Sequence, residues 1–536
     1  ARVLGATTAR AGAGRLEAYV RAKVGQVSGG AVDASATTAL KELGLDSLML
    51  VRLRNAFARE LGAELPTTAV FAASDIQGLA RALGAALPER GSRTREEERR
   101  PEHVPEVPGS ELRPATRDMV RLLRSARPDM PDAAHAIGLA VRLTAPTTRE
   151  ALTDILTRLA GRHAALRTAL PGGGGRSRRI RVERNPASPL LRWTSVHDDA
   201  GVDAADRLRK LLEPPFDLAD TPLWRFELLD AGEGGQHLVF GAHHAVSDLQ
   251  SLLLVAGEID AELSGTFLGD TVTNRDIDLL AEAQRTGDTP GADADVDAAE
   301  WREAFHGCAR LDLTLARPRP ATRTYRAGSV TVEIPDGLME RVTAASSRLA
   351  VTPAAFCLGT LTVLLARARE RERFVLAVPV DTRIHADAYD AVGFFGVPVP
   401  FPAQAGAGDR IEDVLRRTDA RLDRVLTQGA MFSDVLPTLA GQGLHRANAP
   451  LVEVYFNYVR SSAGRLERLE VLPAGTGYSD LDLMITMTPD ASRVRLDHNL
   501  DILDAATSAD LARQFLSLGG GWGGPPPAPG RGGGGW

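Results

Sequence analysis

Apolar residues recur along most of this chain with two alternating periods, and each change of period marks a predicted element. Helical spacing of three and four residues covers 148–159, 412–426 and 505–515. Short apolar runs typical of strands cover 136–143, 329–334 and 374–380. Helices that alternate with strands in this way are typical of an α/β fold. The pattern therefore predicts an α/β region over residues 113–518.

The first part of the chain shows helical spacing without any strand-like run. One apolar face is expected over 16–24, a second over 50–61, and a third over 76–87, where Ser74 or Asp75 would cap the helix. Helices of this length with one apolar face bury it against one another. Residues 12–88 are therefore predicted to form a small all-α four-helix bundle.

Three segments lack the apolar residues that packing requires. Residues 89–112 carry a run of charges and then spaced prolines, which indicates a linker. The stretch 287–299 is rich in Asp, Ala and Gly, and we expect it to separate two lobes, 113–285 and 286–518. Residues 519–536 are almost wholly Gly, Pro and Trp, and they are predicted to be a disordered tail.

Composition limits the class of protein. A chain of 536 residues is too long for one ordinary core, so about three folding units are expected. The net charge of −6 gives no reason to expect nucleic acid or an anionic membrane as a partner. Cys308 and Cys357 are too few for a disulfide framework, and no apolar run has the form of a signal peptide or membrane span. A cytoplasmic protein fits these observations best.

The segment 243–248, His-His-Ala-Val-Ser-Asp, carries the clearest chemical signal. Before it, the apolar runs 223–229 and 237–242 are joined by a glycine-rich connection, which predicts a β-hairpin. After it, apolar residues at helical spacing predict a helix with Asp248 as its N-cap and Gly265 as its stop. The two histidines are therefore expected at a strand end, just before a loop and a helix.

Imidazole, with an ordinary pKa of about 6.5, is the side chain best suited to exchanging a proton near neutral pH. If the strand extends through both residues, His243 and His244 point to opposite faces, so only one can serve a given site. Two alternatives stay open for a histidine here. It could be a hydrogen-bonded core residue, or a metal ligand, although no other His or carboxylate cluster completes a metal site. The pair with its spaced Asp248 favours a base that exchanges protons.

With these residues, the chain resembles the condensation domains of nonribosomal peptide synthetases, whose hallmark is His-His-x-x-x-Asp-Gly. The resemblance covers about residues 112 to 520 and includes further motifs in the family's order. They are Pro114–Arg117, Arg162–Thr168, Pro215–Leu218 with Pro222-Leu223, Val392–Phe395, Ala449–Leu451 with Phe456-Asn457, and Tyr478–Leu483. Leu249 replaces the family's glycine, Val397 an asparagine, and no His-Gln-Asp precedes Met431. These departures leave open a substrate pair other than a peptidyl donor and an aminoacyl acceptor.

The segment Leu43–Met49, Leu-Gly-Leu-Asp-Ser-Leu-Met, resembles the attachment site of an acyl carrier domain. That resemblance implies a 4'-phosphopantetheine arm on Ser47, although a serine there could also be a helix N-cap alone. The flanking stretches Val51–Asn55 and Leu65–Phe71 are closer to polyketide-type carriers than to peptidyl carriers. We therefore expect a polyketide-derived donor, from a polyketide synthase or a hybrid megasynthase.

The condensation resemblance implies a two-lobed α/β fold of the chloramphenicol-acetyltransferase type with a tunnel between the lobes. It implies that His244 is the catalytic histidine, that His243 helps to structure the motif, and that Asp248 is structural. Arg383 is the candidate partner of Asp248, although it could instead be a surface arginine at a strand end. No metal is implied.

The expected reaction joins a carrier-bound acyl thioester to an amine or hydroxyl acceptor, as an amide or ester, in natural-product assembly such as antibiotic biosynthesis, or in chain release. The expected partners are the carrier-bound donor, an acceptor that is free or on a downstream carrier, other megasynthase modules, and a phosphopantetheinyl transferase. A noncatalytic docking domain that recruits a tailoring enzyme to the carrier is the alternative. Epimerisation is a third possible function, but the sequence has no Glu-Gly-His-Gly segment to support it.

Overall fold

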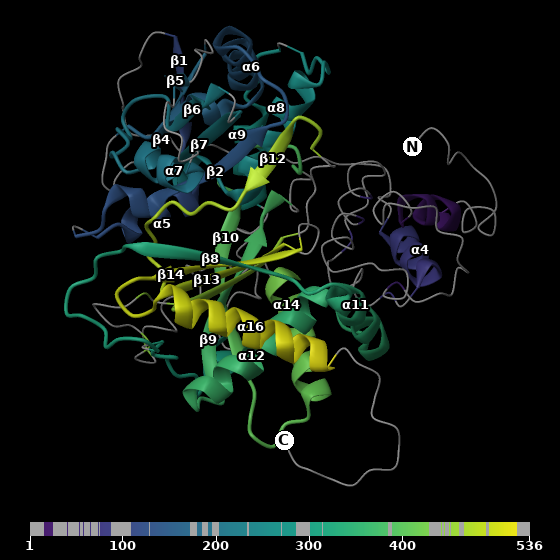
Figure 1. Cartoon of the computed structure of the whole chain (residues 1–536). Helices are drawn as coiled ribbons and strands as arrows, with labels where there is room; N and C mark the ends of the chain where they lie inside the picture. The colour runs from purple at the N-terminus through teal and green to yellow at the C-terminus, as the bar shows by residue number, and fades with distance from the viewer. Residues whose placement is uncertain are drawn as a thin grey trace, which may run out of the picture.

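The computed structural model describes the following residues of the chain. These are 16–24, 40, 53, 57, 65, 73, 75–86, 109–127, 129–171, 179–184, 191–195, 203–232, 235–269, 271–285, 301–313, 315–383, 388–427, 441, 444, 450, 452–459, 466–488 and 492–522. Their helices and strands are drawn in colour in Figure 1. Ser47 and Met431 lie outside them.

The N-terminal lobe contains a five-stranded sheet in the order β12-β2-β7-β6-β5 and a small sheet in the order β1-β4-β3 (Figure 1). The strands of the larger sheet are β2 (Ala136–Leu143), β5 (Leu191–Ser195), β6 (Trp224–Asp230), β7 (Gln236–His243) and β12 (Leu469–Leu472). Those of the smaller are β1 (Ser110–Pro114), β3 (Thr168–Ala169) and β4 (Arg179–Glu183). The α-helices are α5 (Arg117–Ser125), α6 (Arg149–Arg162), α7 (Ala204–Leu212), α8 (Leu249–Leu263) and α9 (Arg275–Arg285). Short 3-10 helices are η1 (Asp132–His135), η2 (Ala164–Arg167) and η4 (His244–Val246).

The C-terminal lobe is built on a six-stranded sheet in the order β10-β9-β11-β13-β14-β8. Its strands are β8 (Ala327–Glu333), β9 (Arg373–Asp381), β10 (Gly396–Gln404), β11 (Val454–Tyr458), β13 (Leu483–Thr488) and β14 (Arg493–Asn499). Its helices are α11 (Leu338–Leu349), α12 (Pro353–Arg369), α14 (Ile411–Thr427) and α16 (Ala505–Trp522). Cys357 is a buried free thiol of α12, as its apolar surroundings predict.

None of the described helices is by itself long and apolar enough to cross a bilayer. Only α11 and α12 taken together reach that length and composition, and they meet at a bend of 98°. Most of α12 is buried in the core of the C-terminal lobe, between α14 and α16.

The predicted α/β class is confirmed, and several element ends follow from local chemistry. β2 has the predicted bounds, 136–143. α6 begins where Thr148 Oγ1 accepts a hydrogen bond from Ala151 N at 3.1 Å, so a side-chain cap sets its start. α8 ends just before Gly265, whose φ of +90° suits a residue without a Cβ.

Three observed elements extend across the predicted domain limits or pair across them. β1 begins at Ser110, inside the predicted linker 89–112, because its backbone pairs with β4. α16 continues to Trp522, four residues into the predicted tail 519–536, where Gly519 is buried and Gly520 lies close to Leu338 of α11. β12 belongs to the sheet of the N-terminal lobe, although the predicted C-terminal lobe, 286–518, includes it.

The carrier region has a separate apolar core. A helix over residues 16–24 and α4 (Ile76–Ala85) contribute Val20, Val24, Leu79 and Leu83 to this core. Leu53 and Phe57, both helical, are also buried in it, which agrees with their predicted spacing. Asp75 caps α4, since its Oδ1 accepts from Gly78 N at 2.7 Å.

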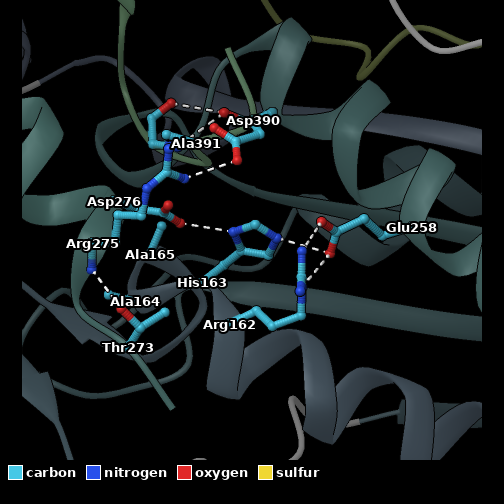
Figure 2. A network of polar contacts seen from close by, with 12 residues as sticks. Arg162, His163, Ala164, Ala165, Glu258, Thr273, Arg275, Asp276, Asp390 and Ala391 are labelled. Atoms are coloured by element: carbon cyan, nitrogen blue, oxygen red, sulfur yellow. Dashed lines mark hydrogen bonds and ion pairs between the residues drawn. The ribbon is translucent and has the colours of Figure 1, made fainter. Parts of the chain in front are cut away.

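A buried charged network joins three helices of the N-terminal lobe (Figure 2). His163, at the end of α6, places Nδ1 2.7 Å from Asp276 Oδ2 of α9 and Nε2 2.9 Å from Glu258 Oε2 of α8. Arg162 also donates to Glu258, at 3.0 Å. Burial by itself would lower the pKa of His163, but the two carboxylates outweigh it and raise that pKa to about 9. His163 is therefore an imidazolium at neutral pH.

We predict that the contribution of His163 to stability falls as the pH rises. The pKa of His163 is higher in the folded protein than in the unfolded chain, where it is about 6.5. Its protonation therefore stabilises the folded state fully below about pH 6.5, and this stabilisation is lost as the pH rises through about 9. The contribution should be at most about 3 kcal/mol. Urea unfolding of wild type and His163→Phe at a series of pH values checks this. A difference between the two proteins that stays constant from pH 6 to 10 would contradict it.

Candidate functional site

The histidine pair lies where β7 ends. His243 is the last residue of the strand and caps η4, whereas His244 is the first residue of η4. The extended geometry that would send the two side chains to opposite faces stops between them, so the turn sets the direction of His244. His243 is 4% exposed and His244 is half-buried. Of the two, His244 is the histidine that a substrate could reach.

His244 is held in one orientation and one tautomer. Its Nδ1 lies 2.8 Å from the carbonyl oxygen of Ser247, which can only accept a hydrogen bond. In the neutral ring Nδ1 therefore carries the proton, and the basic lone pair is on Nε2. The ring also packs edge to face against Phe394, with centroids 5.0 Å apart. His244 thus offers an oriented base.

His243 is buried and uncharged. Its Nδ1 accepts a hydrogen bond from Ala245 N at 3.2 Å, and its ring packs against Phe216 and His135 at centroid distances of 6.0 and 5.9 Å. Burial first, and then the nearby imidazoles of His135 and His244, lower the pKa of His243 to about 3. Its geometry is that of a cap that shapes the turn before His244.

Asp248 is the most heavily hydrogen-bonded group of the site. Its Oδ1 accepts from Ser251 N at 2.7 Å, Ser251 Oγ at 2.8 Å and Arg383 Nη2 at 2.9 Å. Its Oδ2 accepts from Arg383 Nη1 at 2.8 Å, Phe395 N at 3.0 Å and Gly396 N at 2.8 Å. The predicted N-cap is therefore also the point where α8 is joined to the ends of β9 and β10.

Arg383 is fully buried, so it is not the surface arginine of the alternative prediction. Besides its two bonds to Asp248, its Nε donates to Ala391 O at 2.9 Å and its Nη1 to Asp381 Oδ1 at 3.2 Å. Burial by itself would raise the pKa of Asp248 and lower that of Arg383. Their mutual attraction and hydrogen bonds reverse both shifts, so the Asp248 pKa is lowered and the Arg383 pKa is raised. The pair is ionised at neutral pH and structural in its geometry.

Two further residues of the site were not predicted from the sequence. The Ser251 hydroxyl accepts from Gly393 N at 3.0 Å and from Arg383 Nη2 at 2.7 Å, and it lies 2.8 Å from Gly393 O. Ser251 thereby fixes the backbone next to Phe394, the ring that meets His244. A serine in the first turn after an N-cap gives no signal of such a distant contact. Phe394 falls in a motif that the resemblance included, but its contact with His244 is tertiary.

Two of the three departures from the family pattern fall on described residues, and the third, before Met431, lies outside them. Leu249 is the first residue of α8 and is half-buried, and Val397 is buried in β10 opposite Val380. Among the described residues, no group of three or more His, Cys, Asp or Glu side chains could hold a metal ion.

We predict strong coupling between Asp248 and Arg383. Replacing one partner leaves the other buried charge without its bidentate counter-ion, so Asp248→Asn and Arg383→Met should each lower the free energy of unfolding by about 3–5 kcal/mol. The double variant should lose less than the sum, because neither half of this buried pair then remains without the other. Urea unfolding of the wild type, the two single variants and the double variant measures the coupling energy. The exposed pair of Arg513 and Asp510 is the control, where alanine variants should change stability by less than about 1 kcal/mol. Additive effects at Asp248 and Arg383 would contradict the coupling.

Two family models match most of this chain. A family model described as Condensation domain matches residues 133–517, and one described as Phosphopantetheine attachment site matches residues 18–83. One subunit of the linear gramicidin synthase of Brevibacillus parabrevis is 26% identical over 505 residues, which are 89% of this chain and 6% of that protein. The chain therefore spans only a small part of that relative's length.

Two solved structures share the fold. The condensation domain of the Monacolin K polyketide synthase MokA matches with a TM-score of 0.63 and 17% identity, over 77% of this chain and 97% of that one. The X-domain in complex with OxyB from teicoplanin biosynthesis matches with a TM-score of 0.61 and 22% identity, over 81% and 96%. The two-lobed α/β architecture is thus that of these structures. The chain belongs to the condensation domain family of nonribosomal peptide synthetases, and a carrier domain that bears 4'-phosphopantetheine on a serine precedes its condensation domain.

Proposed function

We propose that this chain transfers an acyl group from a carrier-bound thioester to an amine or hydroxyl acceptor, and that His244 is the base. The observation that carries the proposal is the hydrogen bond of 2.8 Å between His244 Nδ1 and Ser247 O, which directs the basic lone pair to Nε2. Phe394, at 5.0 Å, supports the ring in that orientation. A hydrogen-bonded core histidine would also have a fixed tautomer, but it would be buried as His243 is, whereas His244 is half-buried.

In the proposed reaction the acceptor nitrogen or oxygen attacks the thioester carbonyl, a C–N or C–O bond forms, and the C–S bond breaks. The phosphopantetheine arm supplies the thiol that carries the donor. His244 Nε2 takes the proton from the attacking atom and gives it to the departing sulfur, so that His244 is restored. Throughout, Ser247 O keeps the proton on Nδ1 and stabilises the imidazolium that forms.

The dependence on His244 should differ between acceptors. An amine with a pKa of about 8 is partly neutral at working pH, so positioning and late removal of one proton can suffice. A hydroxyl must lose its proton as it attacks, and general-base assistance then contributes about 10²–10⁴-fold. The size of the loss on removing His244 therefore reports the acceptor class.

We propose Ser47 as the attachment site of the arm and a polyketide-derived chain as the donor. The Gly-Leu-Asp-Ser-Leu context of Ser47 and the polyketide-type stretches Val51–Asn55 and Leu65–Phe71 support this. The likeness to a condensation domain within the polyketide synthase MokA is compatible with such a donor. A phosphopantetheinyl transferase would load Ser47, and other megasynthase modules would supply the chain and, where the acceptor is tethered, its carrier. Two free thiols, Cys308 and Cys357, fit a cytoplasmic location.

A noncatalytic docking role is the second candidate. The fold match to the X-domain in its complex with OxyB favours it, since a domain of this fold there forms a complex with another protein. In that case the carrier-bound acyl group would persist, and the chain would bind a tailoring enzyme. The oriented His244 supports transfer in preference to docking.

We predict that His244→Ala abolishes product formation with a hydroxyl acceptor and leaves the loading of Ser47 intact, because the base is lost and the carrier is not. Intact-protein mass spectrometry of the acyl-loaded chain with candidate amines and alcohols measures both. His306→Ala, which removes an exposed imidazole, is the matched control and should behave as wild type. Ser47→Ala should prevent loading altogether.

Turnover by His244→Ala at the wild-type rate would refute the role of His244 as the base. Retention of the acyl group by the wild-type chain with every acceptor, together with binding of a tailoring enzyme, would favour docking.

A further inference from the structure

One strand of the N-terminal lobe comes from late in the chain. β12 pairs antiparallel with β2, with Leu469 opposite Leu143 and Leu472 opposite Ala140. In Figure 1 the yellow β12 lies beside the blue β2, whereas its neighbours in the chain, β11 and β13, belong to the sheet of the C-terminal lobe. Residues 467–472, which we call the strap, therefore join the C-terminal lobe to the N-terminal lobe.

A single carboxylate on α8 receives the start of the strap. Asp260 Oδ1 accepts from Arg468 N at 2.7 Å and from Leu469 N at 2.8 Å, and its Oδ2 accepts from Glu467 N at 3.0 Å. The Arg468 side chain returns to the same end of α8, where its Nη1 donates to Leu263 O at 2.9 Å. Three consecutive backbone N–H groups thus converge on one anion.

The helix alone does not account for Asp260. A negative charge near the C-terminal end of a helix is unfavourable, because the carbonyl end of the helix dipole is itself negative. Asp260 is also only 6% exposed, and a buried carboxylate destabilises the fold unless donors compensate for lost water. The three strap N–H groups supply that compensation. The position of Asp260 therefore makes physical sense only with the strap in place.

α8 is consequently joined to the C-terminal part of the chain at both ends. Asp248, its N-cap, binds Arg383, Phe395 N and Gly396 N, and Asp260, twelve residues later, binds the strap. At 1.5 Å per residue the two carboxylates lie about 18 Å apart along the helix. Within its own lobe α8 is already held, through Glu258, by Arg162 and His163. One attachment would let the C-terminal part of the chain turn relative to α8, whereas two attachments at that separation hold their relative direction.

We propose that Asp260 is a positioning residue for acyl transfer: it clamps the strap to α8 and, with Asp248, fixes His244 relative to the C-terminal lobe. His244 lies just before the start of α8, and its ring meets Phe394 of the other lobe at 5.0 Å, so a rotation of one lobe relative to the other would change that contact. This inference rests on the proposed function.

The test uses the full chain with its carrier loaded. Asp260→Asn keeps the size of the side chain but removes the charge and one acceptor oxygen. Hydrogen exchange at the amides of 467–469 should become at least about tenfold faster, and kcat for transfer should fall about ten- to a hundredfold, since small misplacements of reacting groups have effects of that size. The KM for the acceptor and the shape of the pH–rate profile should stay as in wild type, because His244 itself is intact. Asp260→Glu, which restores the charge, should recover part of the rate.

Asp510→Asn, at an exposed acid of α16, is the control and should leave both exchange and rate unchanged. Exchange in β6 and β7 reports whether each variant is folded. Wild-type exchange at 467–469 in Asp260→Asn, or faster exchange with a wild-type kcat, would overturn the clamp. If the wild-type chain transfers its acyl group to no acceptor, the proposed function has failed instead; if it transfers and the variant equals it, only the clamp has failed.

Discussion

The buried ion pair of Asp248 and Arg383 is the interaction on which the meeting of the two lobes depends. An ionised carboxylate and guanidinium are tolerated in an interior only when nearly all their hydrogen-bonding capacity is met, and here six donor contacts reach Asp248. Those donors come from α8, from the end of β9 and from the start of β10. An arrangement that kept both groups buried but separated them would leave charge unpaired, so the pair favours the observed docking of the lobes.

That arrangement gives two adjacent, identical side chains different roles. His243 ends a strand in a dry environment, where burial keeps its imidazole neutral and its Nδ1 caps the turn. His244 lies one residue further on, in a 3-10 turn that leaves it half-buried and hydrogen-bonded to Ser247 O. Across the lobe junction, Ser251 holds the backbone beside Phe394, and Phe394 in turn meets His244. The base is therefore oriented by local backbone on one side and by the second lobe on the other.

Features that depend on neighbours in the chain were predicted well from the sequence. The bounds of β2, the caps of α4 and α8 and the glycine after α8 all follow from side chains within a few residues of each element end. Features that depend on distant packing were not. α16 continues into a glycine-rich stretch where it lies beside α11, and β12 crosses into the other lobe, where it pairs with β2. Apolar periodicity indicates that one face of an element is buried, but it does not indicate which other element packs against that face.

The sequence by itself determined the α/β class, the order of the motifs, the carrier that precedes the condensation domain, and the strand, loop and helix around His243 and His244. Only the tertiary structure decided that Arg383 is the partner of Asp248, that Ser251 and Phe394 belong to the site, and that Asp260 binds the strap. The physical reason is separation along the chain, because caps and turns are contacts between residues that are close in the sequence. The Asp248–Arg383 pair instead joins positions 135 residues apart, which only the packed fold brings together.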